Sequence, residues 1–141
     1  MQRHELLAHT ADAGLTAVGP TLAGVLEEAA AALAELAADT QGAESAVVPT
    51  GRIAARDLPA LAFAWLNELL GLAESRDAAL VRATVLRAVE TDDGWEVEGR
   101  AYVAPYGGEV RARRQVKAVT FHRLSVEEGP DGWTLTAYVD L

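Results

Sequence analysis

The order in which helical and strand-like patterns follow one another limits the fold of this chain more than any other feature. Two short apolar runs, HELLAH and AGLTAVG, suit strands and are too short for helices. A helix-like segment, a strand-like one, a second helix and four strand-like runs follow. Because helices and strands do not alternate regularly, the order predicts an α+β fold. We expect a two-layer sandwich in which a mostly antiparallel sheet carries two amphipathic helices on one face.

The first helical segment is TLAGVLEEAAAALAELAAD, residues 21–39, in which apolar residues recur at three- and four-residue spacing. Thr21 is placed to cap its N-terminus, since a threonine hydroxyl can accept a bond from a free N–H of the first turn. The acidic residues Glu27, Glu28 and Glu35 are expected to face largely toward solvent.

The second helical segment follows Asp57, which is its expected N-cap. Pro59 falls in the first turn, where the missing N–H does no harm. Trp65 belongs to the apolar stripe of this helix, and the pattern places it in the core rather than at a ligand site.

The remaining segments have β character. AVVPTGRIAARD is interrupted by Pro49 and Gly51, which predicts an irregular strand or an edge strand. The connectors TDDG and EGPDG have turn composition and each separates two β-rich runs. Two hairpins are therefore predicted, over residues 79–90 with 95–103 and over residues 116–127 with 133–140.

Length and composition point to one globular domain spanning residues 1–141. Half of the residues are hydrophobic, and the chain is long enough to bury a core. The absence of cysteine excludes disulfides and thiolate sites and suits a reducing compartment, so a cytoplasmic location is expected. No run approaches the roughly 20 apolar residues that cross a bilayer, and no membrane association is expected.

The formal net charge of −9 argues against a protein whose main task is to bind a nucleic-acid backbone. One dense basic run, RARRQVK at residues 111–117, departs from this acidity. Such a run is either a solvated strand or loop, or a contact with a phosphate or an acidic partner. The spacing of the run leaves both readings open.

The last strand-like segment, WTLTAYVDL, ends in a polar row that closes on Asp140. Its carboxylate lies beside the α-carboxylate of Leu141, so the end either frays into solvent or docks near a cation. If Asp12 of the early motif HTADAGL came close, three carboxylates would form a hard oxygen site. Such a site suits Ca²⁺ or Mg²⁺ rather than zinc.

Lys117 is the only lysine among twelve basic residues. It shares strand parity with Val119 and Phe121, so it is expected on the more apolar face, either as a required point charge or as a snorkelling side chain. His9, beside Thr10, is the histidine best placed for a role, although a buried hydrogen-bonded histidine is the commoner arrangement. No catalytic triad, phosphate loop, dinucleotide fingerprint or zinc-protease helix occurs, so no catalytic residue is assigned.

Together, four fragments resemble the archease family in their order and spacing, and the resemblance covers essentially the whole chain. They are HTADAGL at 9–15, WLNELL at 65–70, VKAVTFH at 116–122 and the terminal DGW…VDL at 131–141.

The resemblance implies a small α+β protein that activates the GTP-dependent RNA-splicing ligase joining tRNA halves, promoting its guanylylation and multiple turnover. It also implies a Ca²⁺ site that falls on Asp12, Asp140 and Leu141, and a functional lysine that falls on Lys117. His9 would support Asp12. Two departures exist: a family glutamate upstream of the lysine motif has no clear counterpart, and the chain ends in leucine where isoleucine is common.

The function expected from the sequence is therefore that of an enzyme activator rather than an enzyme. Its expected cofactor is Ca²⁺, or Mg²⁺ or Mn²⁺, its expected partner is an RNA-splicing ligase, and no direct nucleic-acid binding is expected. One alternative is a stand-alone metal-dependent phosphoesterase that uses His9 or His122 with the same carboxylates. Another is a metal-independent, chaperone-like interaction module.

Overall fold

The computed structural model of the chain describes residues 1–8 and 13–141. These described residues form two helices, a four-stranded sheet of order β1-β2-β9-β8, a three-stranded sheet of order β4-β6-β5 and a short β3-β7 pair. The elements are β1 (Arg3–Ala8), β2 (Ala13–Gly19), α1 (Leu22–Ala37), β3 (Ala38–Asp39), β4 (Ala46–Ala55), α2 (Leu58–Glu74), β5 (Ala78–Thr91), β6 (Gly94–Pro105), β7 (Arg111–Ala112), β8 (Ala118–Gly129) and β9 (Gly132–Asp140).

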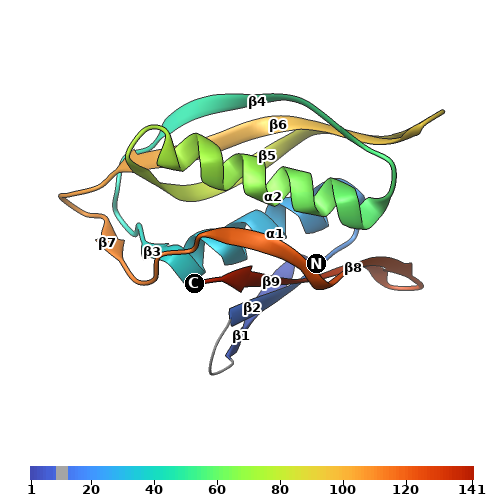
Figure 1. Cartoon of the computed structure of the whole chain (residues 1–141), viewed down its shortest axis with the longest axis horizontal. Coiled ribbons are helices and arrows are strands. Elements are labelled where there is room, and N and C mark those ends of the chain that lie inside the picture. Colours follow the sequence, from blue (N-terminus) through green and yellow to red (C-terminus); the bar gives the residue numbers. More distant parts are fainter. Residues whose placement is uncertain (9–12) are drawn as a thin grey trace.

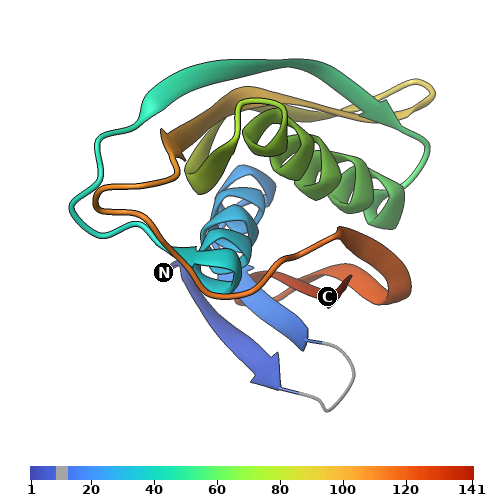
Figure 2. The ribbon, with the colours of Figure 1, turned by 60° about the vertical axis from the view of Figure 1, so that its left-hand side comes forward.

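The helices lie between the two larger sheets, and both ribbon views show this arrangement (Figures 1 and 2). α1 packs on β2 and on β5, and α2 packs on β8 and on β4, so each helix contacts both sheets. The predicted α+β class and the antiparallel pairing are confirmed, and each sheet carries the helices on one face. The strands divide into two such sheets because the helices are apolar on more than one side.

α1 accounts for this arrangement. Thr21 caps it as predicted, with its Oγ1 accepting a hydrogen bond from the Gly24 N–H at 2.9 Å. Alanines around the helix let strands approach it from two sides, and a helix that is apolar over most of its circumference is buried. The buried residues are Leu22, Gly24, Val25, Leu26, Ala29, Ala30, Ala32, Leu33, Ala34 and Leu36.

The acidic residues of α1 are less solvated than the sequence predicts. The Glu27 carboxylate accepts a hydrogen bond from the Val85 N–H of β5 at 2.8 Å. This bond falls where the β5–β6 register shifts, so a side chain satisfies a backbone group beside the irregularity. Glu28 and Glu35 both contact His4 of β1, with the Glu35 Oε2 atom 2.6 Å from Nε2. Of the three, Glu35 is exposed as expected.

α2 begins as the sequence predicts, with the Asp57 Oδ1 atom accepting a hydrogen bond from the Ala60 N–H at 2.8 Å. Trp65 is completely buried, and its Nε1 donates to the Leu26 carbonyl of α1 at 3.0 Å, which confirms its place in the core. Neither α1 nor α2 combines the length and the apolar character that a membrane-crossing helix requires.

Both predicted hairpins are present. β5 and β6 meet at the pair Thr91–Gly94, and β8 and β9 meet at the pair Gly129–Gly132. β4 lies at the edge of its sheet and shifts register between Pro49 and Gly51, as the interrupted sequence indicates.

Candidate functional site at the carboxyl end of the chain

The predicted site residues divide between described and undescribed parts of the chain. Asp12 and His9 lie outside the described residues. Asp140, Leu141 and Lys117 are described, and all three are exposed, with Leu141 at 37%.

β9 is held on both sides where it approaches Asp140. Val139 is paired with Ala13 of β2 on one side and with Val119 of β8 on the other. Val139 and Val119 are each 1% exposed, so the two strands are fixed by a buried apolar contact. The carboxyl end is therefore paired into the sheet as far as Asp140 rather than frayed, and its docking near a cation stays a prediction.

The backbone of Lys117 holds the end of β9 directly. Its N–H donates to the Asp140 carbonyl at 2.9 Å, and Ala118 is paired with Asp140 in the ladder. The lysine motif and the terminal aspartate thus lie side by side although 23 positions separate them in the sequence. A positive side chain and a carboxylate are brought to the same end of the β8–β9 pair.

The expectation that Lys117 lies with Val119 and Phe121 on an apolar face is wrong. Val119 is buried, but Phe121 is 57% exposed and Lys117 is exposed. Lys117 precedes β8, and the β8 register shifts between Thr120 and Ser125, so strict alternation does not extend over the whole segment.

Asn67 of α2 fastens β8 and was not identified from the sequence. Its Nδ2 donates to the Val119 carbonyl at 3.0 Å, and its Oδ1 accepts from the Val119 N–H at 2.9 Å. β8 is the edge strand of its sheet, so the amide takes the place that a further strand would occupy. The only sequence signal is an amide beside Glu68 in the mostly apolar segment WLNELL.

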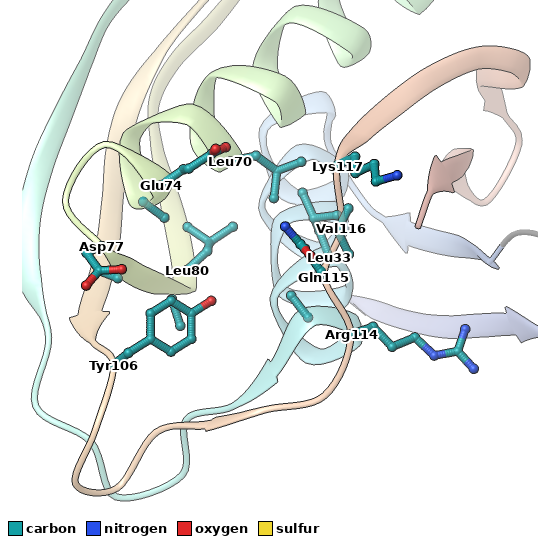
Figure 3. A pocket seen from close by; sticks show the side chains of 14 residues that line it. Leu33, Leu70, Glu74, Asp77, Leu80, Tyr106, Arg114, Gln115, Val116 and Lys117 are labelled. Carbon is teal, nitrogen blue, oxygen red and sulfur yellow. The ribbon is translucent and has the colours of Figure 1, made fainter.

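A cavity of about 330 Å³ opens beside this end of the fold (Figure 3). Leu33, Leu70 and Leu80 form an apolar wall of the cavity, and the segment from Arg114 to Lys117 forms another wall. Figure 3 shows Arg114 and Lys117 directed away from the cavity toward the same side of the chain. The cavity is therefore lined by the segment that leads to Lys117, while the Lys117 ammonium group points away from it.

The described residues do not by themselves complete a metal site. Within 1–8 and 13–141, no group of three or more His, Cys, Asp or Glu side chains is gathered for an ion. Asp140 and the Leu141 carboxylate supply hard oxygen atoms at an exposed strand end, which is the ligand chemistry of Ca²⁺ and Mg²⁺. The third predicted ligand, Asp12, falls outside the described part.

His122 belongs to a separate contact. Its ring meets the Tyr138 ring edge-on, with centroids 6.5 Å apart. Tyr138 lies two positions before Asp140 on β9, so His122 is at the same end of the sheet as Asp140.

Comparisons with known proteins agree with this architecture. A family model described as the Archease protein family (MTH1598/TM1083) matches residues 4–141. Protein archease of Pyrobaculum islandicum is 35% identical over 135 residues, covering 94% of this chain and 91% of the relative. Protein archease of Methanosarcina acetivorans is 30% identical over 141 residues, covering 99% of this chain and 97% of the relative.

The fold is also similar to a solved structure. The solution structure of Methanobacterium thermoautotrophicum protein 1598 matches with a TM-score of 0.81 and 31% sequence identity, covering 98% of each chain. Sequence and structure agree over nearly the full length, and the chain belongs to the archease family.

Proposed function

We propose that this protein activates an RNA-splicing ligase of the kind that joins tRNA halves, promoting its guanylylation and multiple turnover. Membership of the archease family supports this role, because the family model matches residues 4–141, which include the four fragments that resemble the family. The protein would act as an accessory factor, without a catalytic residue of its own.

The observation that carries the proposal is the pairing of Val139 with both Ala13 and Val119. Asp12 precedes Ala13 in the sequence, and Asp140 follows Val139. A peptide bond keeps the Cα atoms of Asp12 and Ala13 about 3.8 Å apart. On this connectivity we assign Asp12, Asp140 and the Leu141 carboxylate as the ligands of one divalent cation.

The donor set suits a hard cation. It consists of carboxylate oxygens, and the chain has no cysteine to favour zinc, so we assign Ca²⁺, with Mg²⁺ or Mn²⁺ as substitutes. When bound, the cation would neutralise phosphate charge at the nucleotide site of the ligase. Lys117, anchored through its backbone to Asp140, would add a positive charge beside that position.

The test compares two aspartates of the β8–β9 hairpin. Asp140→Asn removes a proposed ligand, and Asp131→Asn removes an equal charge in the turn at the opposite end of the hairpin. We expect Asp140→Asn to abolish Ca²⁺ binding in calorimetry and ligase stimulation in a multiple-turnover assay, and Asp131→Asn to retain both. Full stimulation by Asp140→Asn would reject the metal site.

The same assays separate the alternatives. Hydrolysis of a simple phosphoester by the purified protein with Mg²⁺ or Mn²⁺ would favour the phosphoesterase. Ligase stimulation that survives complete chelation of divalent cations from this protein before mixing would favour a metal-independent interaction module.

A further inference from the structure

The basic run that the proposed function leaves without a role continues beyond the residues that first identify it. Residues 110–126 contain no aspartate or glutamate, although the chain as a whole carries a net charge of −9. The same 17 residues contain five cationic side chains and His122. The cationic residues are Arg111, Arg113, Arg114, Lys117 and Arg123.

Arg113 is held by contacts to neighbouring oxygen atoms, and Arg123 lies over the Tyr138 ring, with its guanidinium carbon 6.0 Å from the ring centroid. Arg113 donates from Nη1 to the Glu35 carbonyl at 2.9 Å, and its Nη2 lies 3.9 Å from the Asp39 Oδ2 atom. The other four form what we call the basic stripe: Arg111, Arg114, Lys117 and Arg123. All four are exposed, and none of them forms an ion pair with a carboxylate of residues 1–8 or 13–141.

The chain segment that carries the basic stripe runs from β7 across α1 and into β8 (Figures 1 and 2). In Figure 3, Arg114 and Lys117 extend to the same side, whereas Gln115 lies toward the cavity. Twelve peptide steps separate Arg111 from Arg123, which allows a span of at most about 40 Å.

An exposed aromatic ring lies at the β8 end of the stripe. Phe121 stacks on Phe63 of α2 with ring centroids 4.0 Å apart and planes 11° apart, and it remains 57% exposed. Phe63 covers one face of the Phe121 ring, and solvent reaches the ring from the other side. An exposed phenyl ring beside cationic side chains is the combination on which single-stranded bases stack.

The backbone that presents this ring is irregular. Thr120 pairs with Tyr138 and Ser125 pairs with Thr136, so the four residues 121–124 bulge out of the ladder. Arg123 within the bulge has φ of 57°, a left-handed conformation that costs free energy for any residue other than glycine. Strain of this kind is retained where the surrounding structure holds a functional conformation.

We propose that the basic stripe and Phe121 bind single-stranded RNA, with phosphates along the stripe and one base stacked on the open face of Phe121. At physiological ionic strength the Debye length is about 8 Å, so acidic residues on distant faces repel the strand only weakly. The carboxylates near the stripe include those of Asp140, beside Lys117, and of Glu35, which lines a pocket with Arg114. The proposal departs from the expectation based on net charge, because local charge governs the contact. The choice of RNA rather than DNA rests on the proposed function.

The charge contribution is tested with two double variants of equal charge change. Arg114→Gln with Arg123→Gln removes two stripe cations, and Arg52→Gln with Arg87→Gln removes two exposed cations on the β4-β6-β5 sheet. Binding of a labelled single-stranded RNA of about ten nucleotides is followed by fluorescence anisotropy at several salt concentrations. The stripe variant is expected to bind about tenfold more weakly with a salt slope smaller by about 1.4, and the control to stay within about twofold of the unmodified protein.

The stacking contribution is tested at Phe121. Phe121→Leu keeps apolar contact with Phe63 but offers no flat ring, and Phe121→Tyr keeps the ring. We expect the leucine variant to bind RNA about tenfold more weakly with an unchanged salt slope, and the tyrosine variant to bind normally. Thermal unfolding of each variant verifies that the fold is intact.

Two results would overturn the proposal. Absence of saturable RNA binding by the unmodified protein at about 50 mM salt is one, and equal weakening by the stripe and control variants is the other. If RNA binding is absent while stripe variants lose ligase binding, the stripe contacts an acidic protein surface instead. Because the RNA assay contains no ligase, a failure of ligase stimulation would reject the proposed function and leave this result standing.

Discussion

The side-chain amide of Asn67 hydrogen-bonds both backbone groups of Val119, at 2.9 and 3.0 Å. Val119 is in turn paired with Val139, so one amide in α2 fixes the strand that borders the carboxyl end of the chain. The helix motif and the lysine motif are thereby joined through a single residue.

Replacing this amide is expected to destabilise the protein. Asn67→Ala leaves a partly buried N–H and carbonyl of Val119 without their partner, at a cost of about 2–3 kcal/mol in the free energy of unfolding. Asn67→Asp keeps the acceptor but places a carboxylate oxygen where Nδ2 donates to the Val119 and Phe63 carbonyls, so it should also destabilise the protein at neutral pH. Urea denaturation measures both values, and a loss below about 0.5 kcal/mol for Asn67→Ala would contradict the assignment.

Two glycine-to-alanine changes are expected to act in opposite directions. A Cβ atom on Gly99 would lie 2.3 Å from the Thr84 carbonyl oxygen and 2.8 Å from Trp65 Cη2, so Gly99→Ala should cost at least about 2 kcal/mol. Gly71 is exposed in α2, and a Cβ there meets nothing within 4 Å. Gly71→Ala should stabilise by about 0.5–1 kcal/mol through helix propensity. Thermal unfolding of the two variants checks both signs.

Extending the chain tests the terminal carboxylate without changing a side chain. Two residues added after Leu141 displace the α-carboxylate from its present position. We expect Ca²⁺ affinity and ligase turnover to fall at least about tenfold, because one of three proposed anionic ligands moves away. Unfolding free energy should change by less than about 0.5 kcal/mol, since Leu141 lies beyond β9. Unchanged turnover would remove the terminal carboxylate from the proposed site.

The phenol of Tyr102 on β6 is expected to titrate below its ordinary value of 10.0. A hydrogen bond from Thr84 lowers the pKa most, and the positive charge of Arg82, with its guanidinium carbon 3.7 Å from the ring centroid, lowers it further. Thr84→Val should therefore raise the pKa of Tyr102, as followed by NMR of labelled tyrosine. An unchanged pKa of Tyr102 in Thr84→Val would contradict the hydrogen bond between the two side chains.

The same shift fixes the sign of its effect on stability. Because folding lowers the pKa, the interaction stabilises the folded chain above the unfolded value near 10, and the gain is lost as pH falls through the folded pKa. Loss of the Tyr102–Thr84 hydrogen bond should thus remove this contribution to the free energy of unfolding, and the decrease should appear only in alkaline solution.

Local signals predicted much of the fold. Thr21 and Asp57 were predicted as caps because each side chain bonds an N–H only three residues further along the chain. Both hairpins were predicted because the residues of each turn favour a turn by themselves. The division of the strands into two sheets was not predicted. It depends on how much of the α1 surface is apolar, and alanine is compatible with both a buried and an exposed face.

The candidate site depends on contacts across the chain, which spacing does not reveal. Nothing near Asn67 in the sequence indicates that it reaches Val119, 52 positions away. The β8 bulge that exposes Phe121 contains no glycine or proline from which it could be predicted. Its left-handed residue is Arg123, a residue type that seldom takes this conformation. Asp12, Asp140 and Leu141 were assigned through the family motifs, and their joint role as ligands remains a prediction.

The position of β9 also bears on how the protein is made. β9 follows β2 and β8 in the sequence and so is synthesised after both, yet it lies between them. A chain that stops before Gly132 would leave both of those strands with open edges and no shared core contact at Val139. Prematurely terminated copies would then be unfolded targets for proteolysis instead of inactive competitors for a partner.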